Sequence, residues 1–131
     1  APASPLPGPA TTSSMTVTWT AVAAAGYEVR ASSTNFGVLL PGGVVAFSSA
    51  SGGSLSALGV YGLLANASYY LRVGAYDWGG NATVAAAGPN STLASPVLQS
   101  MVYRVFPTSA TVNWDPSPAS PQSATVEGYV L

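Results

Sequence analysis

The sequence of 131 residues contains no histidine, no cysteine and no lysine, and only seven of its side chains are charged. The usual general base, thiol nucleophile, Schiff-base amine and preferred transition-metal ligands are therefore all missing. We expect a protein that is not an enzyme and that needs no cofactor or metal. Without cysteine no disulfide holds the fold, so its stability has to come from a hydrophobic core or from neighbouring chains.

Charge of either sign is also scarce, because three arginines face four carboxylates and leave a net charge of −1. This balance offers no basic surface for nucleic-acid phosphates and no polybasic patch for anionic lipids. The longest nearly apolar run, residues 37–47, has eleven residues and is interrupted by a Pro-Gly-Gly sequence. It is too short to span a bilayer. We therefore expect neither a nucleic-acid partner nor membrane insertion.

What the chain does have is small and apolar side chains in an alternating order. Ala, Ser and Thr make up 51 of the 131 residues, and 48% of the residues are hydrophobic, too many for intrinsic disorder. Residues 15–19 and 27–31 alternate strictly, which indicates half-buried strands and leaves Glu28 and Arg30 as a surface pair. Shorter apolar or alternating stretches follow at 38–40, 44–47, 58–63 and 69–76. Residues 82–87 and 91–94 form a last expected strand, which Gly88-Pro89 interrupts. Short strands separated by frequent turns are typical of an all-β sandwich.

The sequence also repeats itself. Residues 14–19 (SMTVTW) recur as residues 109–114 (SATVNW), and the Gly-Tyr pair at 26–27 recurs at 128–129. The self-similarity predicts one whole unit over residues 13–95. Before it, the four prolines among residues 1–12 predict a linker or weak edge strand. Residues 96–131 are then the first strands of an incomplete second unit.

A family resemblance rests on residues in the whole unit. Trp19 ends the second predicted strand, residues 26–27 open the third, and residues 62–75 read Gly-Leu-x₅-Tyr-x₂-Arg-Val-x-Ala. This pattern resembles a fibronectin type III domain. The resemblance implies an immunoglobulin-like β-sandwich and a tyrosine corner, in which the Tyr69 hydroxyl bonds back to the backbone. It further implies a binding or spacer module of extracellular or cell-surface chains, without chemistry of its own.

Several aromatic side chains are candidates for an interaction surface. The alternation places Trp19, Tyr27 and Tyr69, together with Trp114 of the repeat, on the inward side, so we expect them in the core. Tyr70 and Tyr76 have the outward phase, and Trp78 lies in the following turn. Exposed aromatics at such places stack on sugars or anchor a protein interface; the alternative is that they cover Arg72 or the sheet edge.

Three Asn-x-Ser/Thr triplets begin at Asn66, Asn81 and Asn90, and each has the sequence of an N-glycosylation acceptor. About one such triplet is expected by chance in this Ser/Thr-rich chain, and all three fall at expected turns. We predict these asparagines as glycosylation sites. The alternative is that they belong to a neutral polar surface.

The last segment contains a β-prone run of five residues, Val102, Tyr103, Arg104, Val105 and Phe106, with nothing in the sequence that could cover it. One explanation is a tandem array of such units that continues beyond this segment. The other is that the run is an unpaired strand that completes a second chain, which produces a head-to-tail polymer.

Two functional hypotheses follow from these observations. The first is a non-catalytic structural or adhesive module of an extracellular surface fibre or tandem-repeat surface protein, which associates with itself or with neighbouring domains through β-edges and aromatic contacts. The second is a spacer or carbohydrate-binding accessory module of a secreted polysaccharide-degrading enzyme, with Tyr76 and Trp78 as the sugar platform. A receptor-type protein-binding domain is a third alternative.

Overall fold

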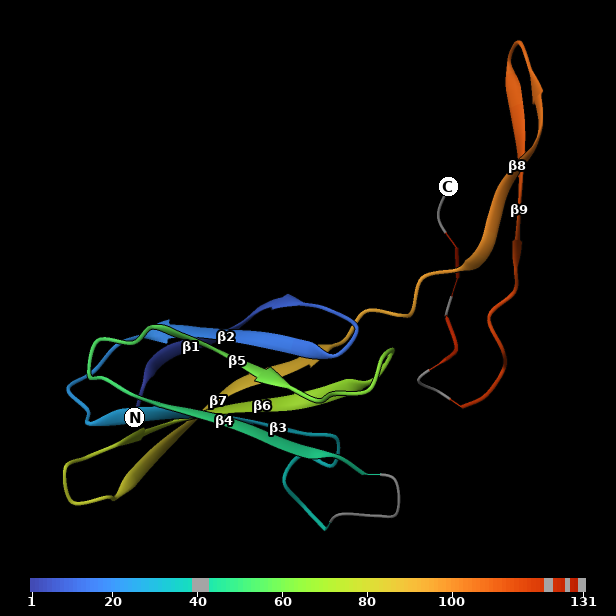
Figure 1. Cartoon of the computed structure of the whole chain (residues 1–131). Coiled ribbons are helices and arrows are strands. Elements are labelled where there is room, and N and C mark those ends of the chain that lie inside the picture. Colours follow the sequence, from blue (N-terminus) through green and yellow to red (C-terminus); the bar gives the residue numbers. More distant parts are fainter. Residues whose placement is uncertain (39–42, 122–123, 127, 130–131) are drawn as a thin grey trace.

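The computed structural model describes residues 1–38, 43–121, 124–126 and 128–129, and within them the chain is all-β (Figure 1). Nine antiparallel strands are found in the described residues, which contain no α-helix. No helix in this part of the chain is long and apolar enough to cross a membrane. The strands are β1 (Ala3–Ala10), β2 (Ser14–Thr20), β3 (Gly26–Ser32), β4 (Val45–Ser51), β5 (Ala57–Tyr61), β6 (Ser68–Tyr76), β7 (Ala82–Ser91), β8 (Leu98–Phe106) and β9 (Ser109–Asp115).

The first seven strands form two sheets that pack against each other, a three-stranded sheet in the order β1-β2-β5 and a four-stranded sheet in the order β4-β3-β6-β7. The core between them takes its buried side chains from both sheets, and the expected burial of Trp19, Tyr27 and Tyr69 is confirmed. The buried apolar residues are Met15, Val17, Trp19, Tyr27, Val29, Ala31, Val60, Leu63, Tyr69, Leu71, Val73, Ala75 and Ala87.

The strand β3 occupies the interior of its sheet and pairs residue for residue with β4 on one side and β6 on the other. Its alternation sends Tyr27 and Val29 into the core and Glu28 and Arg30 to the outer face. A slip of one residue would exchange the two faces and bury both charges, so the hydrophobic pattern determines the register. The register then places Arg30 directly opposite Arg72 of β6.

Proline shapes the strand β1, which is the outermost strand of the three-stranded sheet. It contains three prolines, Pro5, Pro7 and Pro9, and its pairing with β2 is interrupted twice by register shifts. A residue without an N–H is tolerated at a sheet edge, where one side of the strand needs no partner. Residues 3–10 therefore form an edge strand of the first unit, which was expected to comprise residues 13–95 alone.

The strand β7 differs from the sequence-based expectation. We expected Gly88-Pro89 to interrupt it, but the strand runs without a break from Ala82 to Ser91. Gly88 has a φ of +92°, and the pairing with β6 shifts by one residue at this point, between Leu71 and Arg72. A bulge with glycine absorbs the irregularity. Because β7 is the outermost strand of its sheet, Pro89 is tolerated there.

Two buried tyrosines fasten loops of this unit to its sheets. Tyr69 lies near the start of β6, and its hydroxyl accepts a hydrogen bond from the Leu64 N–H over 2.9 Å. The Tyr27 hydroxyl accepts from the Val22 N–H at 2.8 Å and donates to the Val22 carbonyl at 2.6 Å. Both phenols therefore bury their rings and still satisfy their polar ends.

The last two strands, β8 and β9, form a separate two-stranded hairpin that projects from the packed sheets (Figure 1). Every residue of β8 is exposed. The recurrence of the Gly-Tyr pair predicts that residues 128–129 open a further strand, as residues 26–27 do. Gly128 and Tyr129 have no strand conformation, however, and residues 130–131 lie outside the described residues. The hairpin thus has no second layer within the part of the chain that the structure describes.

Candidate functional site

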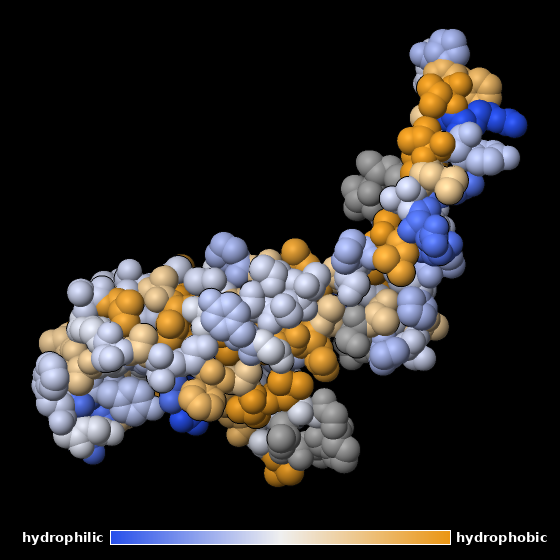
Figure 2. Space-filling view, viewed as in Figure 1, coloured by the Kyte–Doolittle hydropathy of each residue, from blue (hydrophilic) through white to orange (hydrophobic). Residues whose placement is uncertain are grey.

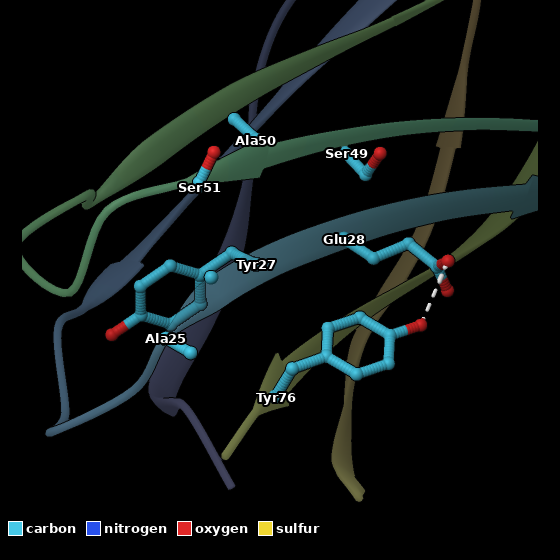
Figure 3. A pocket seen from close by; sticks show the side chains of 8 residues that line it. Ala25, Tyr27, Glu28, Ser49, Ala50, Ser51 and Tyr76 are labelled. Atoms are coloured by element: carbon cyan, nitrogen blue, oxygen red, sulfur yellow. Dashed lines mark hydrogen bonds between the residues drawn. The ribbon is translucent and has the colours of Figure 1, made fainter. Parts of the chain in front are cut away.

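The outer face of the four-stranded sheet gathers three of the seven charged residues. Glu28 and Arg30 come from β3, whereas Arg72 and Tyr76 come from β6, all on the side opposite the core. Arg30 forms an ion pair with Glu28, and its second nitrogen donates to the same carboxylate over 3.2 Å. The Tyr76 hydroxyl also donates to Glu28, over 2.9 Å (Figure 3). The carboxylate is therefore held by two side chains at once.

These contacts change the ionisation of the three partners. Partial burial by itself would raise the pKa of Glu28, but the hydrogen bonds from Arg30 and Tyr76 outweigh it, so the pKa lies below its usual value. The hydrogen bond to Glu28 raises the pKa of Arg30 and also that of Tyr76. The cluster therefore consists of a stable carboxylate, a cation and a neutral phenol at neutral pH.

Arg72 is in a different situation on the same face. Its guanidinium carbon lies 4.0 Å from the centroid of the Phe36 ring, and it donates no hydrogen bond to any residue that the structure describes. Phe36 follows β3 in a turn, where Asn35 and Phe36 have φ values of +52° and +61°. Its N–H donates to the buried Ser32 hydroxyl over 2.9 Å. A bulky residue rarely adopts this left-handed conformation, and here the conformation accompanies the contact between the Phe36 ring and Arg72.

Two hollows lie on this face and share Glu28 and Tyr76. One, of about 470 Å³, is drawn in Figure 3 and is lined by Ala25, Gly26, Tyr27, Glu28, Ser49, Ala50, Ser51 and Tyr76. The other, of about 410 Å³, is lined by Glu28, Arg30, Phe36, Gly37, Val45, Arg72, Gly74, Tyr76, Ala82 and Val84. The second hollow therefore combines both arginines with apolar walls.

The three aromatics expected as an interaction surface do not lie in one site. Tyr76 lines both hollows, whereas Tyr70 and Trp78 line neither. Trp78 is 90% exposed in the turn after β6, and Tyr70 is exposed on the outward face. Neither tyrosine lies over Arg72, whose ring partner is Phe36. Sequence reasoning missed Phe36 because only its loop conformation brings it to the sheet.

A short turn after β6 holds Trp78 outward. One carboxylate oxygen of Asp77 accepts from the N–H groups of Gly79 and Asn81, both at 2.8 Å. The Asn81 side chain and these backbone groups lower the pKa of Asp77, the side-chain hydrogen bond contributing most. The turn therefore has a defined conformation while its tryptophan contacts little of the protein.

The three predicted glycosylation sites differ in exposure. Asn81 is exposed in the turn after β6, while Asn66 and Asn90 are half-buried. The Asn66 amide donates to the Thr125 hydroxyl over 2.8 Å, and the Asn90 amide donates to the Gly8 carbonyl over 3.3 Å. Of the three, Asn81 presents its side chain most openly to a modifying enzyme.

The predicted inter-subunit strand lies within β8. Its residues Val102, Tyr103, Arg104, Val105 and Phe106 are all exposed, and Figure 2 shows hydrophobic side chains along the hairpin. We expected an unpaired strand, but β8 is paired antiparallel with β9 of the same chain. One edge of β8 is therefore occupied, while its other edge is unpaired and its side chains are exposed within the described residues.

Beside the hairpin, the C-terminal segment reproduces a local structure of the first unit. The rings of Trp114 and Tyr129 lie 5.0 Å apart at 53°, and those of Trp19 and Tyr27 lie 5.1 Å apart at 42°. The Ser117 N–H donates to the Tyr129 hydroxyl over 2.8 Å, the same distance over which Val22 donates to Tyr27. The hydrogen bond from Ser117 lowers the pKa of Tyr129. We call this arrangement the Trp–Tyr corner.

The second Trp–Tyr corner opens onto a hollow of about 290 Å³. Its lining is mostly apolar and consists of Ala94, Ser95, Val97, Ser100, Val112, Trp114, Val126, Gly128 and Tyr129. In the first unit the equivalent side chains are covered by the opposite sheet. The hollow therefore exposes Val112, Trp114 and Tyr129, whose counterparts Val17, Trp19 and Tyr27 are buried.

The sheet edges of the first unit are unequally protected. The strand β1 carries three prolines, β7 carries a proline beside its bulge, and β5 is only five residues long. The outermost strand β4 has seven residues without a proline or a charge, and Phe47 on it is 67% exposed. Uncharged regular edges are the ones that pair with other chains.

Within the described residues, no group of three or more His, Cys, Asp or Glu side chains is arranged to hold a metal ion. The acidic side chains at Glu28 and Asp77 are engaged in the separate contacts given above. No protein-family model and no curated protein matches this sequence. The surfaces described here are therefore the basis for assigning a function.

Proposed function

We propose that the chain is a non-catalytic structural or adhesive module of an extracellular surface fibre or tandem-repeat surface protein, built from fibronectin type III-like sandwich units. Support for the unit type comes from seven antiparallel strands in two packed sheets, together with the tyrosine corner at Tyr69. The observation that carries the proposal is the second Trp–Tyr corner, because repeated units are the hallmark of an array.

The uncovered hairpin supports a role in assembly. A two-stranded sheet is marginal in water, and β8 exposes six large apolar side chains. Strands equivalent to β3, β4, β6 and β7 would cover one face, as they do in the first unit. These strands are supplied either by a further segment of the same polypeptide or by another chain, and both arrangements give an extended surface structure.

The scarcity of charge favours lateral contact between such units. Only seven charged side chains oppose close approach, and the edge strand β4 has none. Glycans on Asn81 would add a polar layer to this neutral surface. We propose that the chain acts outside the cell, where this combination serves a fibre or an adhesive coat.

Electron microscopy of the native material, with intact mass measured on the same sample, tests the proposal. Regular fibres or rod-like arrays are expected, with a repeat whose mass matches the chain or the unit, and hexose-sized mass increments would establish glycosylation. A discrete monomer of the bare sequence mass, with residues 97–131 cleaved readily by protease, would contradict the proposal.

The edge strand offers a sharper test of assembly. Phe47→Lys places a charge on β4 and is expected to reduce self-association about tenfold or more, with little effect on stability, because an edge charge opposes strand pairing. Leu6→Lys on the proline-rich strand β1 is the matched control. Sedimentation velocity measures both variants. Equal association of the wild type and Phe47→Lys would exclude the β4 edge.

A carbohydrate-binding accessory module is the second candidate, and the 90% exposure of Trp78 favours it. Such a module is retained on an insoluble polysaccharide as a monomer, and Trp78→Ala abolishes the retention. Unchanged retention of the variant would remove Trp78 from consideration.

A further inference from the structure

The outer face of the four-stranded sheet carries two cations, Arg30 and Arg72, and one anion, Glu28. Arg30 and Arg72 stand directly opposite each other on neighbouring strands, an unfavourable arrangement for like charges. Glu28 compensates Arg30 through the ion pair and is further bound by Tyr76. The guanidinium of Arg72 has a ring beneath it but donates no hydrogen bond to the described residues. Its donors remain available to an anion.

The surroundings hold Arg72 in one place. The guanidinium carbon lies 4.0 Å from the Phe36 ring centroid, and this cation–π contact favours one position of the side chain. The hollow of about 410 Å³ beside it has Val45 and Val84 as apolar walls. Gly74 contributes no side chain to the same hollow. A ligand with one negative charge and an apolar body of a few carbon atoms fits this combination.

The backbone around the hollow limits the class of ligand. The strands β3 and β6 lie in the interior of the sheet, so each is already hydrogen-bonded to a strand on both sides. A peptide crossing this face therefore finds no main-chain partners and gains little over its side chains. A sugar makes its contacts through hydroxyl and carboxylate groups to side chains, while its C–H face packs on apolar or aromatic surfaces. The Glu28 carboxylate accepts from hydroxyls and repels a second negative charge.

We propose that this hollow binds the carboxylate of a uronic acid residue in an acidic polysaccharide. Arg72 pairs with the sugar carboxylate, Glu28 and Tyr76 contact its hydroxyls, and Val45 and Val84 pack on its C–H groups. The site goes beyond the structural role proposed above, because it gives the module a ligand chemistry of its own. It also differs from a platform at Trp78, which does not line the hollow.

Affinity electrophoresis in gels containing polygalacturonate tests the site. Fully methyl-esterified polygalacturonate is the matched probe, because it keeps the sugar backbone and lacks the charge. The wild-type chain is expected to be retarded by the acid and not by the ester. Arg72→Gln is expected to weaken the retardation about tenfold or more, since a charge-assisted pair is lost. Arg72→Lys retains only part of the effect, because an ammonium does not form the paired donors.

Controls separate this site from other causes. Arg104→Gln removes a cation from the hairpin, away from the hollow, and should bind like the wild type. Circular dichroism and thermal unfolding show whether each variant is folded. Equal weakening by Arg104→Gln, or equal retardation in the esterified gel, would overturn the proposal. So would retardation by polyglutamate that depends on Arg72 to the same degree, because the site would then recognise any carboxylate. Fibre formation by Arg72→Gln stays intact, so the two proposals are tested separately.

Discussion

The chain contains the same local structure twice, once covered and once bare. The Trp–Tyr corner of the first unit lies between two sheets, and Tyr27 is 1% exposed. The corner beside the C-terminal hairpin has nearly the same ring distance, yet Tyr129 is 42% exposed. The corner therefore forms from a short stretch of sequence, whereas its burial depends on an opposite sheet.

The comparison predicts where the stability of this chain resides. The first unit buries thirteen apolar residues from both sheets, and the hairpin buries none of its large ones. Burial of apolar area is the main favourable term in folding. We therefore expect cooperative unfolding of residues 3–93, with the hairpin opening at much lower free energy.

The largest expected effect is a truncation in the covered core. Leu71→Ala removes a side chain that is 1% exposed and should lower the free energy of unfolding by about 2–5 kcal/mol. Leu98→Ala, on the hairpin at 70% exposure, should change it by less than about 0.5 kcal/mol. Urea denaturation followed by tryptophan fluorescence measures both. Similar losses would mean that the hairpin belongs to the same core.

The second-largest expected effect is the loss of the tyrosine hydroxyl from each of the two Trp–Tyr corners. Tyr27→Phe leaves the Val22 N–H and carbonyl without their partner in a half-buried place, and should cost about 1–3 kcal/mol. Tyr129→Phe frees only the Ser117 N–H, which water reaches, so we expect less than about 1 kcal/mol. Thermal unfolding of both variants tests this order, and a larger loss for Tyr129→Phe would reverse the comparison.

The smallest effect is a dependence of stability on acidic pH that Glu28 gives to the first unit. The pKa of Glu28 is lowered in the folded chain, so its contribution is present above its ordinary value of 4.5 and is lost as the pH falls through the folded value. The ion pair is partly exposed, which limits the contribution to about 1 kcal/mol or less. Glu28→Gln should reduce the loss of stability below pH 4.5, while the part that Asp77 contributes remains. An unchanged profile would show that the contact with Arg30 and Tyr76 adds nothing.

Much of the fold was predictable because its signals are local. Alternation with a period of two placed Trp19, Tyr27 and Tyr69 inside, and their burial confirms this. The break expected at Gly88-Pro89 was wrong, because the position of β7 at the sheet edge and a bulge tolerate both residues. The intrinsic strand preference of a segment does not indicate whether that strand lies at a sheet edge, because this depends on its pairing with segments far away in the sequence.

The candidate site was only partly visible in advance. The sequence by itself determined that Glu28 and Arg30 share an outer face and that Tyr76 points outward, since these follow from strand phase. Only the tertiary structure decided that Arg72 stands opposite Arg30, that Tyr76 donates to Glu28, and that Phe36 lies beneath Arg72. The reason is physical: phase is a property of neighbouring residues, whereas these contacts require the β3–β6 register and one left-handed turn, which form only when the whole sheet assembles.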